Sequence, residues 1–303
     1  MLAFLPKWLL GCIASILFAI NSVIWLTLIF VFAIIKAIPF KPLRQRVNLL
    51  LDFFATGWTT GNSAIQNFTI ATEWDVEGLG QLTKKEWYMI IANHQSWVDI
   101  FVLQRVLNGK VPFIKFFLKK ELLWVPFFGL AWWALDFPFM VRYTRKFIRK
   151  HPHLKGKDVE TTRKACEKFR YKPVSVMNFV EGTRLTQKKH DSQQSLYRHL
   201  LKPKAGGTGF VLGAMHDSLH KIIDVTIYYP DGIPTFWQLL SGQIRKVVVR
   251  VNVLPIESQM IGDYDADKEY RKEIQRYLND LWVGKDQLLD QLKTENDERR
   301  SDA

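Results

Sequence analysis

The fold of this chain is decided by residues 87–99, which read WYMIIANHQSWVD. The first six residues of this stretch are apolar or aromatic and favour a β-strand. The residues that follow are polar and include His94 and Asp99. The stretch therefore predicts a strand that ends at a histidine, with an aspartate five residues later.

Similar strand-like runs recur along the chain and alternate with helical stretches. They are expected at Thr72–Val76, Pro112–Ile114, Val174–Phe179, Ile222–Tyr229 and Lys246–Leu254. One helix is expected to begin at Asp158, whose side chain can cap the backbone amides of the first turn. Such alternation predicts an α/β fold, in which helices cover the faces of a sheet.

Residues 1–40 are predicted to form a membrane anchor. Between residues 8 and 40 the one charged residue is Lys36, and Asn21 is the one strongly polar break. A bilayer core of about 30 Å needs about 20 apolar residues in a helix. The segment can therefore span the bilayer, or bend near Asn21 and lie within one leaflet as a helical hairpin.

Basic residues gather after this segment rather than before it. A single one, Lys7, precedes it, and the four that follow are Lys36, Lys41, Arg44 and Arg46. By the positive-inside rule, the bulk of the protein is expected to face the cytoplasm, at the inner membrane if the protein is bacterial. Residues 41–70 carry apolar side chains at spacings of three and four, which predicts an amphipathic helix that links membrane and domain.

The remainder is predicted to hold one folded domain, residues 71–260, and a C-terminal extension, residues 261–303. A charged helix from about Asp267 to Leu292 begins the extension, and the polar residues 293–303 are expected to form a flexible tail. A second apolar stretch, Leu122–Val141, is interrupted by two prolines and an aspartate. We expect it to dip into the membrane interface or to line a channel rather than to span.

Composition narrows the partners. The chain has 42 Lys and Arg against 29 Asp and Glu, a formal charge of +13, which favours anionic lipid, phosphate or nucleic acid as a partner. Charge alone does not choose among these three. The two cysteines, Cys12 and Cys166, provide neither a disulfide framework nor a cysteine-rich metal site.

The histidine and aspartate after the first strand favour a general base. A carboxylate at Asp99 can hold the His94 ring in one tautomer, so that the other ring nitrogen faces a substrate. No Gly-x-Ser-x-Gly elbow accompanies them, so the nucleophile would be a hydroxyl of the substrate itself. Taken alone, this spacing more often marks a strand-end histidine that a turn aspartate merely satisfies.

Two further blocks contain groups that can bind phosphate. Glu181, Gly182, Thr183 and Arg184 follow another apolar strand, and a glycine turn, a hydroxyl and a guanidinium suit an anion. The other block runs from Lys119 and Lys120 through the apolar stretch to Arg142. The plainer readings are an ordinary turn and a solvated basic rim.

In this order and spacing, the three blocks resemble the 1-acylglycerol-3-phosphate (lysophosphatidic acid) acyltransferase family, whose signature glycerol-3-phosphate acyltransferases share. Leu201–Lys204 and Asp224–Pro230 look like the lysocardiolipin acyltransferase branch. The resemblance implies a mixed β-sheet flanked by helices, a catalytic domain at 71–260, and a hydrophobic tunnel for the acyl chain. A candidate wall for that tunnel is the aromatic cluster Trp132, Trp133, Phe137 and Phe139.

The resemblance also implies roles for single residues. His94 would be the base and Asp99 its orienting partner, with Asn93, Gln95 and Ser96 in support. Phosphate would be bound by Glu181, Gly182, Thr183, Arg184, Arg142, Lys119 and Lys120. Three positions depart from the family pattern: Val180 stands for a proline, Asp136 or Phe137 for a glycine, and Val225-Thr226 for Val-Pro.

The sequence therefore predicts an enzyme that transfers a fatty acyl group from acyl-CoA or acyl carrier protein to a lysophospholipid hydroxyl, with 1-acylglycerol-3-phosphate as the expected acceptor. No cofactor and no metal are expected. A transacylase, an acyltransferase for another acceptor, and a non-catalytic basic membrane scaffold remain alternatives. A nucleic-acid partner is disfavoured because the basic residues flank apolar segments.

Overall fold

The computed structural model describes residues 2, 4–80, 82–140, 169, 172–264 and 266–301. Its centre is a six-stranded sheet in the order β1-β8-β7-β2-β6-β3, parallel throughout except for the antiparallel pair β7–β8. The strands are β1 (Glu73–Glu77), β2 (Trp87–Ala92), β3 (Ile114–Phe116), β6 (Ser175–Asn178), β7 (Leu219–Tyr228) and β8 (Lys246–Pro255). The predicted α/β fold with a mixed sheet is confirmed.

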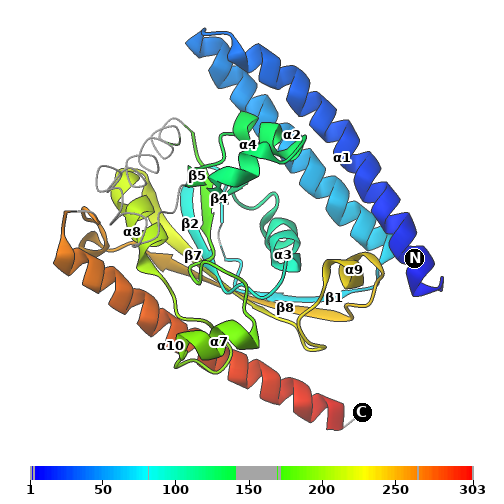
Figure 1. The fold of residues 1–303 in the computed structure, drawn as a ribbon, viewed down its shortest axis with the longest axis vertical. Helices are drawn as coiled ribbons and strands as arrows, with labels where there is room; N and C mark the ends of the chain where they lie inside the picture. Colours follow the sequence, from blue (N-terminus) through cyan, green and yellow to red (C-terminus); the bar gives the residue numbers. More distant parts are fainter. Residues whose placement is uncertain are drawn as a thin grey trace.

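Both faces of the sheet are covered by helices. The side chains of β2 alternate between two apolar cores: Tyr88 and Ile90 pack toward one face, Met89 and Ile91 toward the other. The first face is covered by α1 (Lys7–Ala37), α2 (Lys41–Thr69), α3 (Val98–Leu107) and α4 (Phe128–Ala134); the second by α8 (Ala205–Ala214) and α10 (Lys268–Ser301). Figure 1 shows the α1–α2 hairpin and α10 on opposite sides of the sheet. Burial on both faces explains why β2 is a continuous apolar run.

One predicted strand is displaced. Strand β3 begins at Ile114 instead of ending there, and it carries Lys115, whose side chain is only 1% exposed. The ammonium of Lys115 donates a hydrogen bond of 2.6 Å to the backbone oxygen of Leu135 and lies 3.5 Å from a carboxylate oxygen of Asp52. A strand pattern does not anticipate a buried lysine, because its partners come from distant segments.

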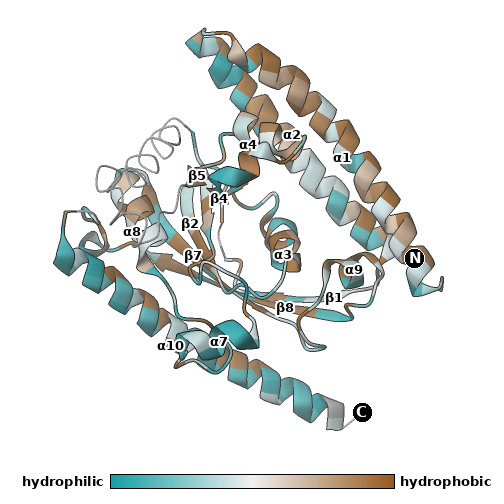
Figure 2. Cartoon of the chain, viewed as in Figure 1, coloured by the Kyte–Doolittle hydropathy of each residue, from teal (hydrophilic) through white to brown (hydrophobic). Residues whose placement is uncertain are grey.

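The N-terminal hairpin is built from α1 and α2, and α1 continues without a bend through Asn21. The Asn21 amide donates to the backbone oxygen of Trp58 and to Oδ1 of Asn62, at 3.0 and 2.9 Å. The polar break is therefore satisfied by α2, and of the two predicted arrangements, a continuous helix and a helix bent near Asn21, α1 adopts the first. The apolar character of α1 along its length is visible in Figure 2.

Helix α1 is long and apolar enough to cross a membrane, with a mean hydropathy of 2.5 in its most apolar window. Both of its ends nevertheless contact the folded domain. Near the N-terminal end, Gly11 packs against the ring of Trp237 in α9 (Phe236–Leu240), so closely that an added Cβ would lie 2.7 Å from it. Near the other end, Lys36 forms an ion pair of 2.6 Å with Asp136.

The second apolar stretch forms no continuous helix over the residues that the structure describes. It divides into the 3-10 helix η1 (Lys120–Trp124), α4, and β5 (Phe139–Met140), which pairs with β4 (Leu118–Lys119). Phe127 and Asp136 have φ angles of 64° and 55° and mark the breaks. A spanning helix is excluded here, as the prolines predicted.

Helix α10 extends further than predicted. It continues to Ser301, nine residues beyond Leu292, through residues expected to be a flexible tail. The side chains of residues 293–295 and 297–299 are exposed, so the segment is helical without packing. Lys, Glu and Arg are strong helix formers, and a helix already begun extends without burial. The helix predicted from Asp158, together with Cys166, lies outside the described residues.

Candidate active site

The predicted histidine and aspartate meet at the carboxyl end of β2. His94 follows this strand directly, and Asp99 lies in the first turn of α3. Nδ1 of His94 is 2.9 Å from Oδ2 of Asp99. The same oxygen accepts the backbone N–H groups of Gln95 and Ser96, at 2.6 and 2.8 Å, so the carboxylate also organises the turn between strand and helix.

A tyrosine that the sequence did not single out completes the pair. The Tyr229 hydroxyl donates to Oδ1 of Asp99 at 2.7 Å, immediately after β7. Burial, followed by the charge of Asp99, raises the pKa of Tyr229 well above its usual value. Tyr229 is therefore a fixed donor, and both oxygens of Asp99 are held. The signal that the sequence offered was the position of Tyr229 at the end of a predicted strand.

The ring of His94 is fixed by one stacking partner and by its contact with Asp99. It stacks on Phe179 with centroids 3.8 Å apart and planes inclined by 13°. Because Nδ1 faces Asp99, Nε2 is the nitrogen left to exchange a proton with a substrate. The side chain is 13% exposed, which permits contact with a ligand from one side. This geometry fits a general base.

Three residues around the histidine have structural tasks. The Asn93 amide exchanges two hydrogen bonds of 2.9 Å with the backbone of Ile227, and so extends the β2–β7 pairing by one residue. The Ser96 hydroxyl donates to the backbone oxygen of Pro234 at 2.5 Å. Gln95 contributes its backbone N–H to Asp99. Asn93, Gln95 and Ser96 thus position the backbone around His94.

The second predicted block is brought directly against the first. Gly182 adopts a φ of 71°, which only glycine adopts without strain, and its N–H donates to the backbone oxygen of Phe179 at 2.8 Å. The N–H of Leu185 donates to the backbone oxygen of His94, also at 2.8 Å. The tight turn therefore joins the two motifs.

Glu181 does not point toward a substrate. It is 1% exposed, and its two carboxyl oxygens accept the backbone N–H groups of His94 and Leu201, at 3.2 and 3.3 Å. Burial raises the pKa of Glu181 to about 8. The predicted contact of Glu181 with phosphate does not fit this geometry, because both carboxyl oxygens are buried and already accept backbone N–H groups. Its task is to hold the histidine loop.

Cationic groups do line this edge. Arg184 is exposed and its guanidinium lies 4.9 Å above the ring of Trp97. Lys189, which the sequence did not single out, donates to the Thr183 hydroxyl and to the backbone oxygen of Arg184, at 2.7 and 2.9 Å. Lys189 belongs to α7 (Gln187–Gln193), the helix that follows the motif. Arg184 and Lys189 are thus placed together near Thr183.

The remaining predicted cations are less tightly connected to this site. Lys119 ends β4, Lys120 begins η1, and both are exposed. They follow Phe116, whose ring stacks at 6.2 Å on Phe179. Arg142 lies outside the described residues.

The predicted aromatic wall divides in two. Phe137 is buried and Trp132 packs against the same core, whereas Trp133 is 46% exposed. Phe139 is half-buried at the start of β5. Phe137 and Trp132 therefore serve the packing of the domain.

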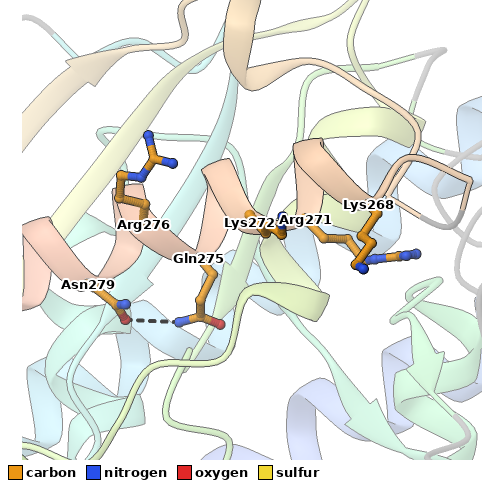
Figure 3. Close-up of a pocket in the computed structure, with 6 residues that line it drawn as sticks. All are labelled: Lys268, Arg271, Lys272, Gln275, Arg276 and Asn279. Carbon is orange, nitrogen blue, oxygen red and sulfur yellow. Dashed lines mark hydrogen bonds between the residues drawn. The ribbon is translucent and has the colours of Figure 1, made fainter.

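One surface hollow lies elsewhere. A cavity of 490 Å³ runs along one face of α10, shown in Figure 3. Its lining residues are Lys268, Arg271, Lys272, Gln275, Arg276 and Asn279. None of them belongs to the three sequence blocks. This hollow is therefore separate from the predicted site residues.

Comparison with known proteins decides the family. The model of the family described as Acyltransferase matches residues 73–229, more than half of the 303 residues, and this span contains His94, Asp99 and Glu181–Arg184. The chain belongs to the Acyltransferase family. Members of this enzyme family need an acyl donor and an acceptor. In this acyltransferase, the part that matches the family runs from β1 to Tyr229.

Several curated relatives of this acyltransferase are similar over most of its length. It is 27% identical over 236 residues to an uncharacterized acyltransferase of Saccharomyces cerevisiae, 24% over 238 residues to 1-acyl-sn-glycerol-3-phosphate acyltransferase 3 of Arabidopsis thaliana, and 28% over 188 residues to 1-acyl-sn-glycerol-3-phosphate acyltransferase delta of Mus musculus. These matches cover 68%, 73% and 57% of this chain. They span only 59%, 57% and 46% of the relatives' own lengths.

Among solved structures, the crystal structure of the 1-acyl-sn-glycerophosphate acyltransferase PlsC from Thermotoga maritima is similar with a TM-score of 0.48 and 17% identity, over 91% of this chain and 98% of that one.

Proposed function

We propose that this acyltransferase transfers a fatty acyl group from a thioester to the free hydroxyl of a lysophospholipid, with His94 as general base. The observation that carries the proposal is the contact of 2.9 Å between Nδ1 of His94 and Asp99, which leaves Nε2 for the substrate. Nε2 accepts the proton of the acceptor hydroxyl while its oxygen attacks the thioester carbonyl. The tetrahedral intermediate then expels the thiolate, which takes the proton back from His94.

The proposed acceptor is 1-acylglycerol-3-phosphate, and the product phosphatidic acid. Two cations support a phosphate-bearing acceptor: the exposed guanidinium of Arg184 and the ammonium of Lys189, which meets the Thr183 hydroxyl. Two of the curated relatives carry the acceptor in their names. Lys119, Lys120 and Arg142 remain further proposed contacts. The donor is acyl-CoA or acyl carrier protein.

We further propose that α1 lies along one leaflet and does not cross the bilayer. Both ends of α1 contact the same domain, through Gly11 with Trp237 and through Lys36 with Asp136. A perpendicular helix would bring the charged domain into the hydrocarbon core, at great cost. Exposed aromatic residues near the hairpin, Trp124 at 83% and Phe127 at 70%, extend the apolar surface. The cytoplasmic leaflet remains the proposed side.

The function is tested by an acceptor panel. Purified protein in vesicles is given acyl-CoA or acyl carrier protein thioesters with lysophosphatidic acid, glycerol 3-phosphate or other lysophospholipids, and the products are identified by mass spectrometry. Phosphatidic acid formed only with lysophosphatidic acid supports the proposal. Product formed from a phospholipid donor without thioester would indicate a transacylase, and another lipid product would indicate another acceptor.

A non-catalytic scaffold makes a different prediction. It would yield no product with any donor and acceptor, and would bind anionic vesicles equally well after substitution of His94 or Asp99. Release of thiol that needs the acceptor, and that stops in His94→Ala, excludes the scaffold.

A further inference from the structure

A buried ion pair lies behind the active-site edge of the sheet, on the face away from α3. Lys285 of α10 has a side chain with 0% exposure, and its Nζ lies 2.7 Å from Oδ1 of Asp224 on β7. The same ammonium donates to the backbone oxygen of Val225 at 2.8 Å and to the hydroxyl of Thr226 at 2.9 Å. The ammonium therefore combines one ion pair with two hydrogen bonds, all to neighbouring residues of β7.

The residues that Lys285 holds are neighbours of the catalytic strand. In the β2–β7 pairing, Asp224 is opposite Ile91 and Val225 is opposite Ala92. Ala92 is the last residue of β2 and lies two positions before His94. The lysine therefore fixes the part of β7 against which the histidine segment is aligned.

Lys285 also acts on Glu181, the carboxyl group that accepts the backbone N–H of His94. Burial raises the pKa of Glu181, the charge of Asp99 raises it further, and the charge of Lys285 lowers it. The charged side chains that act on Glu181 come from two elements: Asp99 from α3 and Lys285 from α10. Lys285 is the cation of this set.

Packing alone gives no reason for a lysine at this position. The Lys285 ammonium lies 5.3 Å from the ring centroid of Trp282, within an otherwise apolar core. Enclosing a charge pair is costly, and an apolar side chain of similar volume often serves stability as well or better. The charge therefore points to a task beyond attaching α10.

We propose that Lys285 is a positioning residue of the acyl-transfer site. It fixes β7 through Asp224, Val225 and Thr226, and it places a buried positive charge behind Glu181, which in turn holds the backbone of His94. This inference rests on the proposed function of His94 as base.

The kinetic test compares a double variant with a matched control. Lys285→Met/Asp224→Asn removes both charges and leaves no unpaired ion. We expect kcat of the double variant to fall about tenfold or more with KM changed by less than about twofold, and the acidic limb of its rate profile to move to higher pH. Lys293→Met, exposed on the same helix, is the control and should match wild type.

A folded double variant with the kcat and pH profile of wild type would overturn the proposal, because the pair would then only attach α10.

A readout independent of activity separates this inference from the proposed function. In protein labelled with ¹⁵N-histidine, the backbone amide of His94 should titrate with Glu181, and its midpoint should rise in the double variant and not in Lys293→Met. An unmoved midpoint contradicts the role of Lys285 even if the enzyme is active. A moved midpoint in a protein without acyltransferase activity supports the role and rejects the proposed reaction.

Discussion

Two side-chain pairs, His94–Asp99 and Lys285–Asp224, lie at the same edge of the sheet, on opposite faces, and they differ in what they leave unused. The His94–Asp99 pair engages both carboxylate oxygens, yet the ring keeps Nε2 and 13% exposure of its side chain. In the Lys285–Asp224 pair the ammonium also donates to Val225 and Thr226, and none of the lysine side chain is exposed. The proposed base thus keeps a ring nitrogen and partial exposure within a rigid frame, whereas the proposed positioning residue is fully enclosed.

The largest effect is expected from Asp99→Asn, which removes the carboxylate that holds His94. The amide would present an N–H or a weaker acceptor to Nδ1, so Nε2 would lose its role as acceptor. We expect kcat to fall about 10³-fold to 10⁴-fold, measured as acceptor-dependent thiol release. Asp191→Asn, exposed on α7, is the matched control. Activity within about tenfold of wild type would show that the tautomer is fixed by something else.

Glu181 links the two pairs and predicts an unusual dependence of stability on pH. Its pKa is about 8 in the fold against an ordinary value of 4.5, because burial penalises the charged form. The folded protein then binds more protons than the unfolded chain between these pH values, so the free energy of unfolding falls as pH rises from 4.5 to 8. Each pKa unit corresponds to about 1.4 kcal/mol, which makes the loss a few kcal/mol.

Denaturant unfolding at several pH values measures this slope, and Glu181→Gln should flatten it. A stability that rises from pH 5 to 8 in the wild type, or an unchanged slope in the variant, would show that another group governs the dependence.

Tyr229→Phe sharpens the comparison because it removes one donor from the His94–Asp99 pair and leaves the Lys285–Asp224 pair unchanged. Oδ1 of Asp99 would lose its partner at 2.7 Å inside the core. A buried acceptor left without its donor costs about 1–3 kcal/mol. We expect kcat to fall about tenfold, with a stability loss of similar size. Tyr228→Phe, its neighbour on β7, is the control; equal losses in both would remove the special role of Tyr229.

The smallest effect is expected at the rim. Lys189→Ala removes one ammonium beside Thr183 and Arg184. If this ammonium contacts the acceptor phosphate, KM for lysophosphatidic acid should rise about threefold to tenfold at unchanged kcat, since the contact is partly exposed. Lys188→Ala, exposed on the same helix, should leave KM unaltered. A drop in kcat without change in KM would place Lys189 in the chemistry instead.

The sequence predicted most of the sheet, and the approach of His94 to Asp99, because both rest on local patterns. An apolar run specifies β2, and a spacing of five residues brings His94 to the first turn of α3. Partners from far along the chain were missed. Tyr229 lies 130 residues from Asp99, and Lys285 lies about 60 residues from its contacts on β7. Tyr229 lies in the family-like stretch Asp224–Pro230, but nothing local assigns its hydroxyl to Asp99, and nothing local distinguishes Lys285 from a solvated lysine.

Orientation was also beyond the sequence. Glu181 was placed in the correct turn, but only the fold shows that its carboxyl group faces the backbone of His94 and Leu201. Asn21 was recognised as a polar break, yet its effect depends on Asn62 and the Trp58 backbone in α2, which satisfy it without a bend. Both cases turn on hydrogen-bond partners that only the tertiary structure brings together.

We propose above that Nε2 of His94 is the base of acyl transfer. The most direct test is acceptor-dependent thiol release from acyl-CoA in the same vesicles by wild type and His94→Ala, with unfolding midpoints measured for both. The account predicts release that requires lysophosphatidic acid in the wild type and a loss of about 10³-fold or more in a folded variant. Equal release by both proteins would contradict it.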